Sequence, residues 1–95
     1  MIKYLKDHIK EEIEGAVDYM TKAIEHKGKH CGQTFYVMSG MELDHANSLL
    51  KMFRAEEKPE TVTDAEYTEM YKEILDAYAE GMGKIEALKK IYWEA

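Results

Sequence analysis

The sequence predicts an all-α protein in which an antiparallel two-helix hairpin is followed by a third, C-terminal helix. Apolar residues recur at spacings of three and four in three separate segments, the period of an amphipathic helix. Six glycines and one proline are too few to form the many turns of a β-sandwich or barrel. The 95 residues make a single small domain over residues 1–95. Such a small core favours further stabilisation by a metal or by a second chain.

The first helix is expected over about residues 2–27. Its apolar stripe consists of Ile2, Leu5, Ile9, Ile13, Ala16, Val17, Met20, Ala23 and Ile24. Gly28 follows His26 and Lys27, and basic residues before a glycine are typical of the end of a helix. A tight turn at Gly28 is therefore expected to lead into the next helix.

The second helix is expected over about residues 32–55, before a polar segment whose Pro59 cannot continue a helix. Its apolar stripe consists of Phe35, Met38, Met41, Ala46, Leu49, Met52 and Phe53. We expect this stripe to face the core.

The third helix is expected over about residues 64–93. Thr63 and Glu66 have the spacing of a capping box, which marks its start. Gly81 and Gly83 interrupt its apolar stripe and predict a kink or a close helix contact. This helix carries no acid on its stripe, and we expect it to cover the outside of the hairpin or to extend an oligomer.

Polar residues stand on the apolar stripes of the first two helices. At about 100° per residue, Glu42 lies about 10° and His45 about 50° from the centre of the second stripe. Glu12 lies inside the edge of the first stripe, about 65° from its centre. A hairpin that turns near Gly28 places Glu12 level with the Glu42–His45 pair.

A buried carboxylate without a partner costs several kcal/mol, so two of them in a small core need an explanation. A divalent cation bound by Glu12, Glu42 and His45 supplies one, because it neutralises the charge and uses the oxygens. Glu42 and His45 lie one turn apart on one helix, with Cβ atoms about 5–6 Å apart. The alternative is a histidine hydrogen-bonded to an acid of the core.

Three ligands are half of a dinuclear centre. A carboxylate-bridged site in a four-helix bundle takes four carboxylates and two imidazoles. Two copies of the hairpin around a two-fold axis supply this set, and the four glutamates balance two divalent ions. Three ligands per metal leave coordination positions open, which suits iron or manganese redox chemistry.

Two acidic motifs carry a resemblance to a known family. The run Glu11-Glu12-Ile13-Glu14 precedes Glu42-Leu43-Asp44-His45, and 30 residues separate Glu12 from Glu42. In these features about residues 5–55 resemble the ferritin-like di-iron superfamily, and within it the half-length encapsulated ferritins. The resemblance implies that two chains complete a four-helix bundle with a ferroxidase centre at their interface.

The resemblance also implies residue roles. Glu12, Glu42 and His45 would be the metal ligands and catalytic residues, while Glu11 and Glu14 would gather or pass iron. Tyr19, seven residues after Glu12, would be the aromatic residue near the centre. From the sequence itself, His8 lies one turn before Glu12 and could hydrogen-bond it, receive incoming metal or be an exposed histidine without a role.

The expected function is oxidation of Fe(II) to Fe(III) by oxygen or peroxide at a di-iron centre, in iron storage or detoxification. The expected assembly is a homodimer or a higher homo-oligomer, and manganese or zinc are the substitute metals. One alternative is a peroxide-reducing or manganese-dependent redox protein of the same type. Another is a non-enzymatic helical adaptor, in which Glu42 and His45 form a buried polar pair that gives specificity.

Composition narrows the partners and the location. The net charge of −6 argues against nucleic acid, and no apolar run approaches the length of about 18 residues that a membrane span requires. Cys31, the single cysteine, and a charged N-terminal segment favour a cytoplasmic protein. The resemblance adds a nanocompartment with an encapsulin shell as partner. However, the sequence ends in IYWEA directly on the third helix, so we expect no docking tail.

Overall fold

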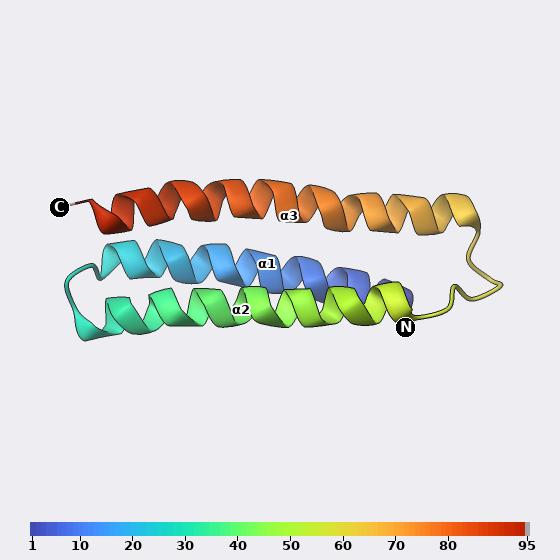
Figure 1. Ribbon diagram of the computed structural model, residues 1–95, viewed down its shortest axis with the longest axis horizontal. Helices are drawn as coiled ribbons and strands as arrows, with labels where there is room; N and C mark the ends of the chain where they lie inside the picture. The colour runs from blue at the N-terminus through green and yellow to red at the C-terminus, as the bar shows by residue number, and fades with distance from the viewer. Residues whose placement is uncertain (95) are drawn as a thin grey trace.

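The computed structural model describes residues 1–94, and over that range the chain is all-helical, with three helices and no strand. The helices are α1 (Ile2–Glu25), α2 (His30–Ala55) and α3 (Asp64–Trp93). They lie side by side in an elongated bundle of 53 × 18 × 15 Å (Figure 1). The predicted all-α class is confirmed. Across residues 1–94, none of the helices combines the length and the apolar character that a membrane-spanning helix requires.

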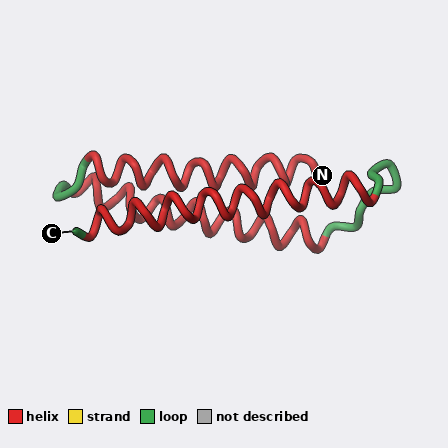
Figure 2. Tube along the Cα trace, turned by 90° about the horizontal axis from the view of Figure 1, so that it is seen from above, coloured by secondary structure: helices red, strands yellow, loops and turns green. Residues whose placement is uncertain are grey.

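The helix ends follow local chemistry. The Thr63 hydroxyl accepts from the backbone N–H of Glu66, and the Glu66 carboxylate accepts from the backbone N–H of Thr63, so the predicted capping box is present. Gly28 has a φ of +87°, the left-handed conformation that a glycine adopts at a tight turn. The helix α1 ends at Glu25, two residues earlier than expected. The helix α2 begins at His30, also two residues earlier than expected, because the extended Lys29 serves as its N-cap. The two loops lie at opposite ends of the bundle (Figure 2).

The core is built around α1, which packs against both other helices. Its buried residues are Ile2, Leu5, Ile9, Ile13, Ala16, Met20 and Ala23. The buried residues of α2 are Gly32, Ser39, Ala46 and Phe53, and those of α3 are Ile74, Gly81 and Ile85. The seven-residue spacing in α2 makes a narrow seam against α1, typical of helices that cross at a small angle.

The backbones of α2 and α3 stay apart. Over the described residues no Cα atom of one helix lies within 8 Å of a Cα atom of the other. Long side chains bridge the gap: the Tyr78 hydroxyl donates to Asn47 Oδ1 (2.8 Å), and Arg54 Nε donates to the Tyr71 hydroxyl (2.9 Å). The helix α1 is therefore the element that holds the bundle together.

The helices α1 and α3 approach most closely at Gly81. A Cβ atom built on Gly81 would lie 2.3 Å from Cγ2 of Ile13, whereas one built on Gly83 would meet nothing within 4 Å. The glycine pair predicted either a kink or a close helix contact. The close contact occurs, at Gly81, and α3 is one continuous helix.

The apolar stripe of α2 is only partly buried, contrary to expectation. Met41 and Met52 are each 52% exposed, and the side chain of His45 is 60% exposed. The narrow seam against α1 explains the difference, because it covers one flank of the stripe and the backbone of α3 keeps its distance from α2. The flank with Met41, His45 and Met52 is left open; we call it the open face of α2.

Candidate metal centre

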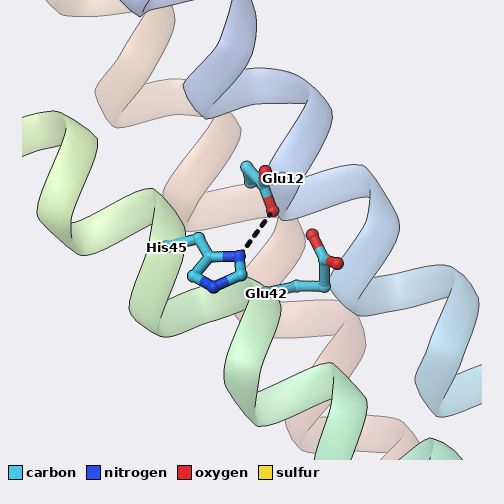
Figure 3. Close-up of side chains that lie close together, drawn as sticks. All are labelled: Glu12, Glu42 and His45. Atoms are coloured by element: carbon cyan, nitrogen blue, oxygen red, sulfur yellow. Dashed lines mark ion pairs between the residues drawn. The ribbon is translucent and has the colours of Figure 1, made fainter.

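Glu12 of α1 comes together with Glu42 and His45 of α2 near the middle of the hairpin (Figure 3). Each residue offers one ligand atom, and these atoms all lie within 4.8 Å of one another. Glu12 and Glu42 are half-buried, and His45 lies at the edge of the open face. Two helices therefore present two carboxylates and one imidazole to a common point.

The register of the hairpin is fixed next to this cluster. Ser39 is buried on the seam, and its hydroxyl donates to the backbone carbonyl of Ala16 (2.7 Å). Ser39 lies three residues before Glu42, and Ala16 lies four residues after Glu12. A slip of α2 along α1 would leave the buried Ser39 hydroxyl unpaired, at a cost of about 1–3 kcal/mol. This bond therefore helps to hold Glu12 level with Glu42.

Glu12 is the best-contacted member of the cluster. Its Oε1 lies 3.1 Å from Nε2 of His8, and its Oε2 lies 3.6 Å from Nδ1 of His45. The side chain is 16% exposed, and Oε2 is buried with no hydrogen-bond partner. An unpaired buried carboxylate oxygen is uncommon in folded proteins and fits an atom that accepts a cation.

The two carboxyl groups shift each other's pKa. The pKa of Glu42 is raised, first by its close side-chain interaction with Glu12, then by burial and by the charge of Glu12. The pKa of Glu12 is lowered, first by the side-chain interaction with Glu42 and then, against the effect of burial, by the charges of His45 and His8. Both shifts arise because the two acids lie close together. A divalent cation bound by both carboxylates would relieve their repulsion.

Gly15, which sequence reasoning missed, makes room for the Glu42 carboxyl group. A Cβ atom at this position would lie 3.3 Å from Oε2 and 3.6 Å from Cδ of Glu42. A glycine inside a helix lowers helix stability by about 1 kcal/mol relative to alanine. Gly15 lies three residues after the inward-facing Glu12. That combination is the signal by which it could have been found.

We expect Gly15→Ala to weaken metal binding without weakening the fold. The added methyl group pushes the Glu42 carboxylate away by a few tenths of an ångström, and a misplaced ligand should lower the affinity for Zn²⁺ about tenfold. Helix propensity acts in the opposite direction on stability, by up to about 1 kcal/mol in favour of alanine. Calorimetric zinc titration and thermal unfolding measure the two effects. Gly40→Ala is the matched control, because a Cβ there meets nothing within 4 Å; equal zinc affinity in both variants would refute the steric role of Gly15.

The other residues singled out in the sequence lie in different places. The Glu11 carboxylate is exposed, 4.0 Å from Nδ1 of His8, on the side of the cluster. Glu14 lies instead in a groove between α1 and α3, on another flank of α1. Tyr19 stacks on Phe35, with ring centroids 6.0 Å apart, about two helical turns from Glu12. Of the residues expected to assist the centre, the structure therefore brings His8 and Glu11 to its edge.

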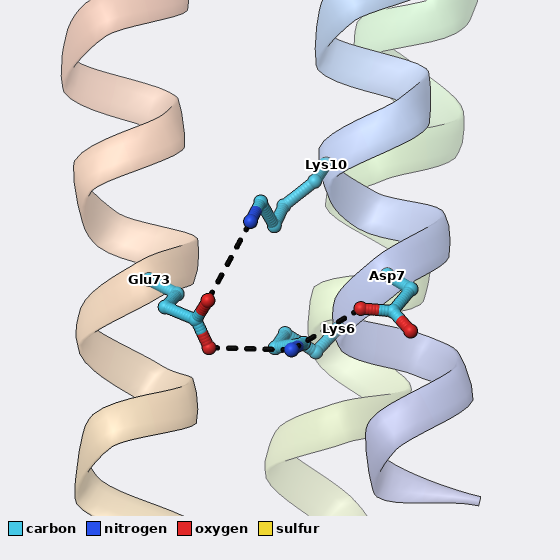
Figure 4. Close-up of polar contacts among 4 residues, drawn as sticks. All are labelled: Lys6, Asp7, Lys10 and Glu73. Carbon is cyan, nitrogen blue, oxygen red and sulfur yellow. Dashed lines mark hydrogen bonds and ion pairs between the residues drawn. The ribbon is translucent and has the colours of Figure 1, made fainter.

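The flank of α1 that faces α3 is occupied by ion pairs. Nζ of Lys6 lies 3.2 Å from Oε2 of Glu73 and 3.2 Å from Oδ1 of Asp7, and Nζ of Lys10 lies 3.6 Å from Oε1 of Glu73 (Figure 4). The hydrogen bond from Lys6 lowers the pKa of Glu73. Lysines already compensate this acid, so this flank of α1 serves contact between helices.

Two carboxylates and one imidazole form a donor set that suits Fe²⁺, Mn²⁺ or Zn²⁺. The unpaired Oε2 of Glu12 fits such an ion, as described above. Three donors from one chain also leave coordination positions open. No family model, curated protein or solved structure matches this chain.

Proposed function

We propose that this protein is a ferroxidase, which oxidises Fe(II) to Fe(III) in iron storage or detoxification. Glu12, Glu42 and His45 of two chains would bind the iron. The observation that carries the proposal is the buried, unpaired Oε2 of Glu12, held within 4.8 Å of a second carboxylate and an imidazole. These donors are the ones that iron takes in carboxylate-bridged centres of helical bundles.

The open face of α2 supports completion of the centre by a second copy. Met41 and Met52 are each 52% exposed, and His45 lies on the same face. An adaptable methionine surface beside an incomplete ligand set fits a self-complementary interface around a two-fold axis. In the proposed dimer, α1 and α2 of both chains form a four-helix bundle and α3 lies outside it. The shared centre then has four carboxylates and two imidazoles.

The proposed reaction balances with oxygen or with peroxide. Two Fe(II) ions give up one electron each, and O₂ with two protons becomes H₂O₂; alternatively, H₂O₂ with two protons becomes two water molecules. Glu12 and Glu42 hold the two substrate ions close together and neutralise their charge. The net charge of −6 raises the local concentration of cations.

Anaerobic loading with Fe(II), followed by oxygen or by peroxide, tests the function. We expect about one iron ion per chain by elemental analysis, and a loss of chelatable Fe(II) at least about 100-fold faster than in buffer, the scale of a moderate catalytic effect. His45→Ala is the inactive control, because it removes one donor of the cluster. Iron that binds but oxidises no faster than in buffer would contradict a ferroxidase. Turnover with peroxide alone would favour the peroxide-reducing alternative.

A further inference from the structure

We propose that His8 is a positioning residue of this centre, which determines the oxygen that Glu12 presents to the metal. The inference rests on the proposed metal site and adds a role for a side chain that is not one of its three ligands. His8 lies outside the group of ligand atoms that are mutually within 4.8 Å. It acts on the metal through Glu12.

Tyr4, His8 and Glu12 form a ladder along one flank of α1. They are spaced four residues apart, so each lies one turn above the previous one. The rings of Tyr4 and His8 stack, with centroids 5.5 Å apart and an interplanar angle of 29°. Nε2 of His8 then lies 3.1 Å from Oε1 of Glu12. Tyr4 therefore packs against one side of the His8 ring, and the other end of the ring is directed at Glu12.

The hydrogen position follows from the chemistry of the two groups. An ionised carboxylate only accepts hydrogen bonds, so at this 3.1 Å separation Nε2 of His8 would be the donor to Glu12. Nδ1 faces Glu11, 4.0 Å away, which is exposed. Because α1 itself supplies the whole ladder, the arrangement already exists before a second chain or a metal binds.

The contact with His8 divides the Glu12 carboxylate into two unequal oxygens. Oε1 is engaged by His8, whereas Oε2 is buried, unpaired and 3.6 Å from Nδ1 of His45. The oxygen that faces the other two donors is the one left for the metal. His8 therefore holds Glu12 in the rotamer in which it binds through Oε2, and the metal need not reorient it. Partners of this kind typically change metal affinity by about 10- to 100-fold.

Cobalt(II) binding by the full chain tests this role. His8→Phe keeps a ring for Tyr4 but has no donor, whereas His8→Gln keeps an N–H donor. We expect the apparent Kd for Co(II) to rise by about 10- to 100-fold in His8→Phe. The stoichiometry should stay at one ion per chain, and His8→Gln should recover most of the affinity. His8→Ala, which lacks both ring and donor, should bind at least as weakly as His8→Phe; circular dichroism confirms that each variant is folded.

Four results would overturn the inference. Wild-type affinity in His8→Phe or His8→Ala would show that the contact does not matter. Equal losses in His8→Phe and His8→Gln would show that a side-chain N–H donor does not restore the affinity, so donation to Glu12 would not be the role of His8. A folded His8→Ala that binds no cobalt at saturation would make His8 a ligand. A wild-type chain without cobalt binding would overturn both the inference and the proposed function, whereas cobalt binding without iron oxidation would contradict only the ferroxidase.

Discussion

Glu42→Ala is expected to abolish metal binding and the metal-dependent assembly of the chain. The substitution removes one of three donors from each chain and therefore two of the four carboxylates of the proposed centre. The affinity for Fe(II) should fall by more than about 100-fold, beyond the loss caused by removing an outer hydrogen-bond partner. Anaerobic sedimentation with and without Fe(II) measures the dimer fraction. We expect wild-type protein to assemble with Fe(II) and the variant to remain at its metal-free distribution.

Asp44→Ala is the matched control for this experiment. It removes the same charge from the same helix, two residues away, from an exposed side chain that lies outside the cluster. The control should assemble on iron as the wild type does. If Glu42→Ala also assembles on iron, Glu42 is not a ligand. Complete assembly of the metal-free wild type would show instead that the metal does not drive association, because the four acids would then tolerate one another without it.

Gly81→Ala is expected to lower the free energy of unfolding by about 1–3 kcal/mol, the usual cost of overpacking a core. Its Cβ would lie 2.3 Å from Cγ2 of Ile13, an atom on a branched carbon that cannot rotate away freely. To relieve the overlap, α3 must move away from α1, which loosens the buried Ile74 and Ile85. Urea-induced unfolding, followed by circular dichroism, measures the change.

Gly83→Ala provides a control with the opposite sign. A Cβ at Gly83 meets nothing within 4 Å, so helix propensity alone should stabilise this variant by up to about 1 kcal/mol. The same substitution two residues apart in one helix should therefore have opposite effects. Similar stability of the two variants would show that α1 and α3 are not in close contact at Gly81. Metal affinity should survive in both, because Glu12, Glu42 and His45 come from α1 and α2.

The three helices could be predicted because each combines a regular apolar period with clear end signals. The Thr63 capping box and the turn at Gly28 follow directly from residue chemistry. The seam of α2 could not be predicted, since Gly32 and Ser39 bury little apolar surface and do not stand out in an apolar pattern. Their small size matters only once α1 lies against them, and that is a property of packing.

The cluster of Glu12, Glu42 and His45 could be anticipated because turn position and helical period together place residues in a hairpin. Gly15 gives only a weak signal in the sequence, a glycine inside a helix three residues after Glu12, and its role becomes clear only from the space around the Glu42 carboxyl group. The sequence also did not predict which flank of α1 packs against α3. For this reason, the groove position of Glu14, between α1 and α3, appears only in the structure.

Glu12, the proposed ligand on α1, and the contacts of α1 with α3 occupy different flanks of the same helix. Changes that improve heat resistance can therefore be sought on α3, Gly83 among them, and along the flank of α1 that α3 covers, while the selectivity of the proposed metal site would be engineered separately along the other flank. A natural lineage would have the same freedom: its outer helix could diverge quickly while the hairpin keeps its chemistry. The scaffold thus offers protein engineers two independently adjustable surfaces on one 24-residue helix.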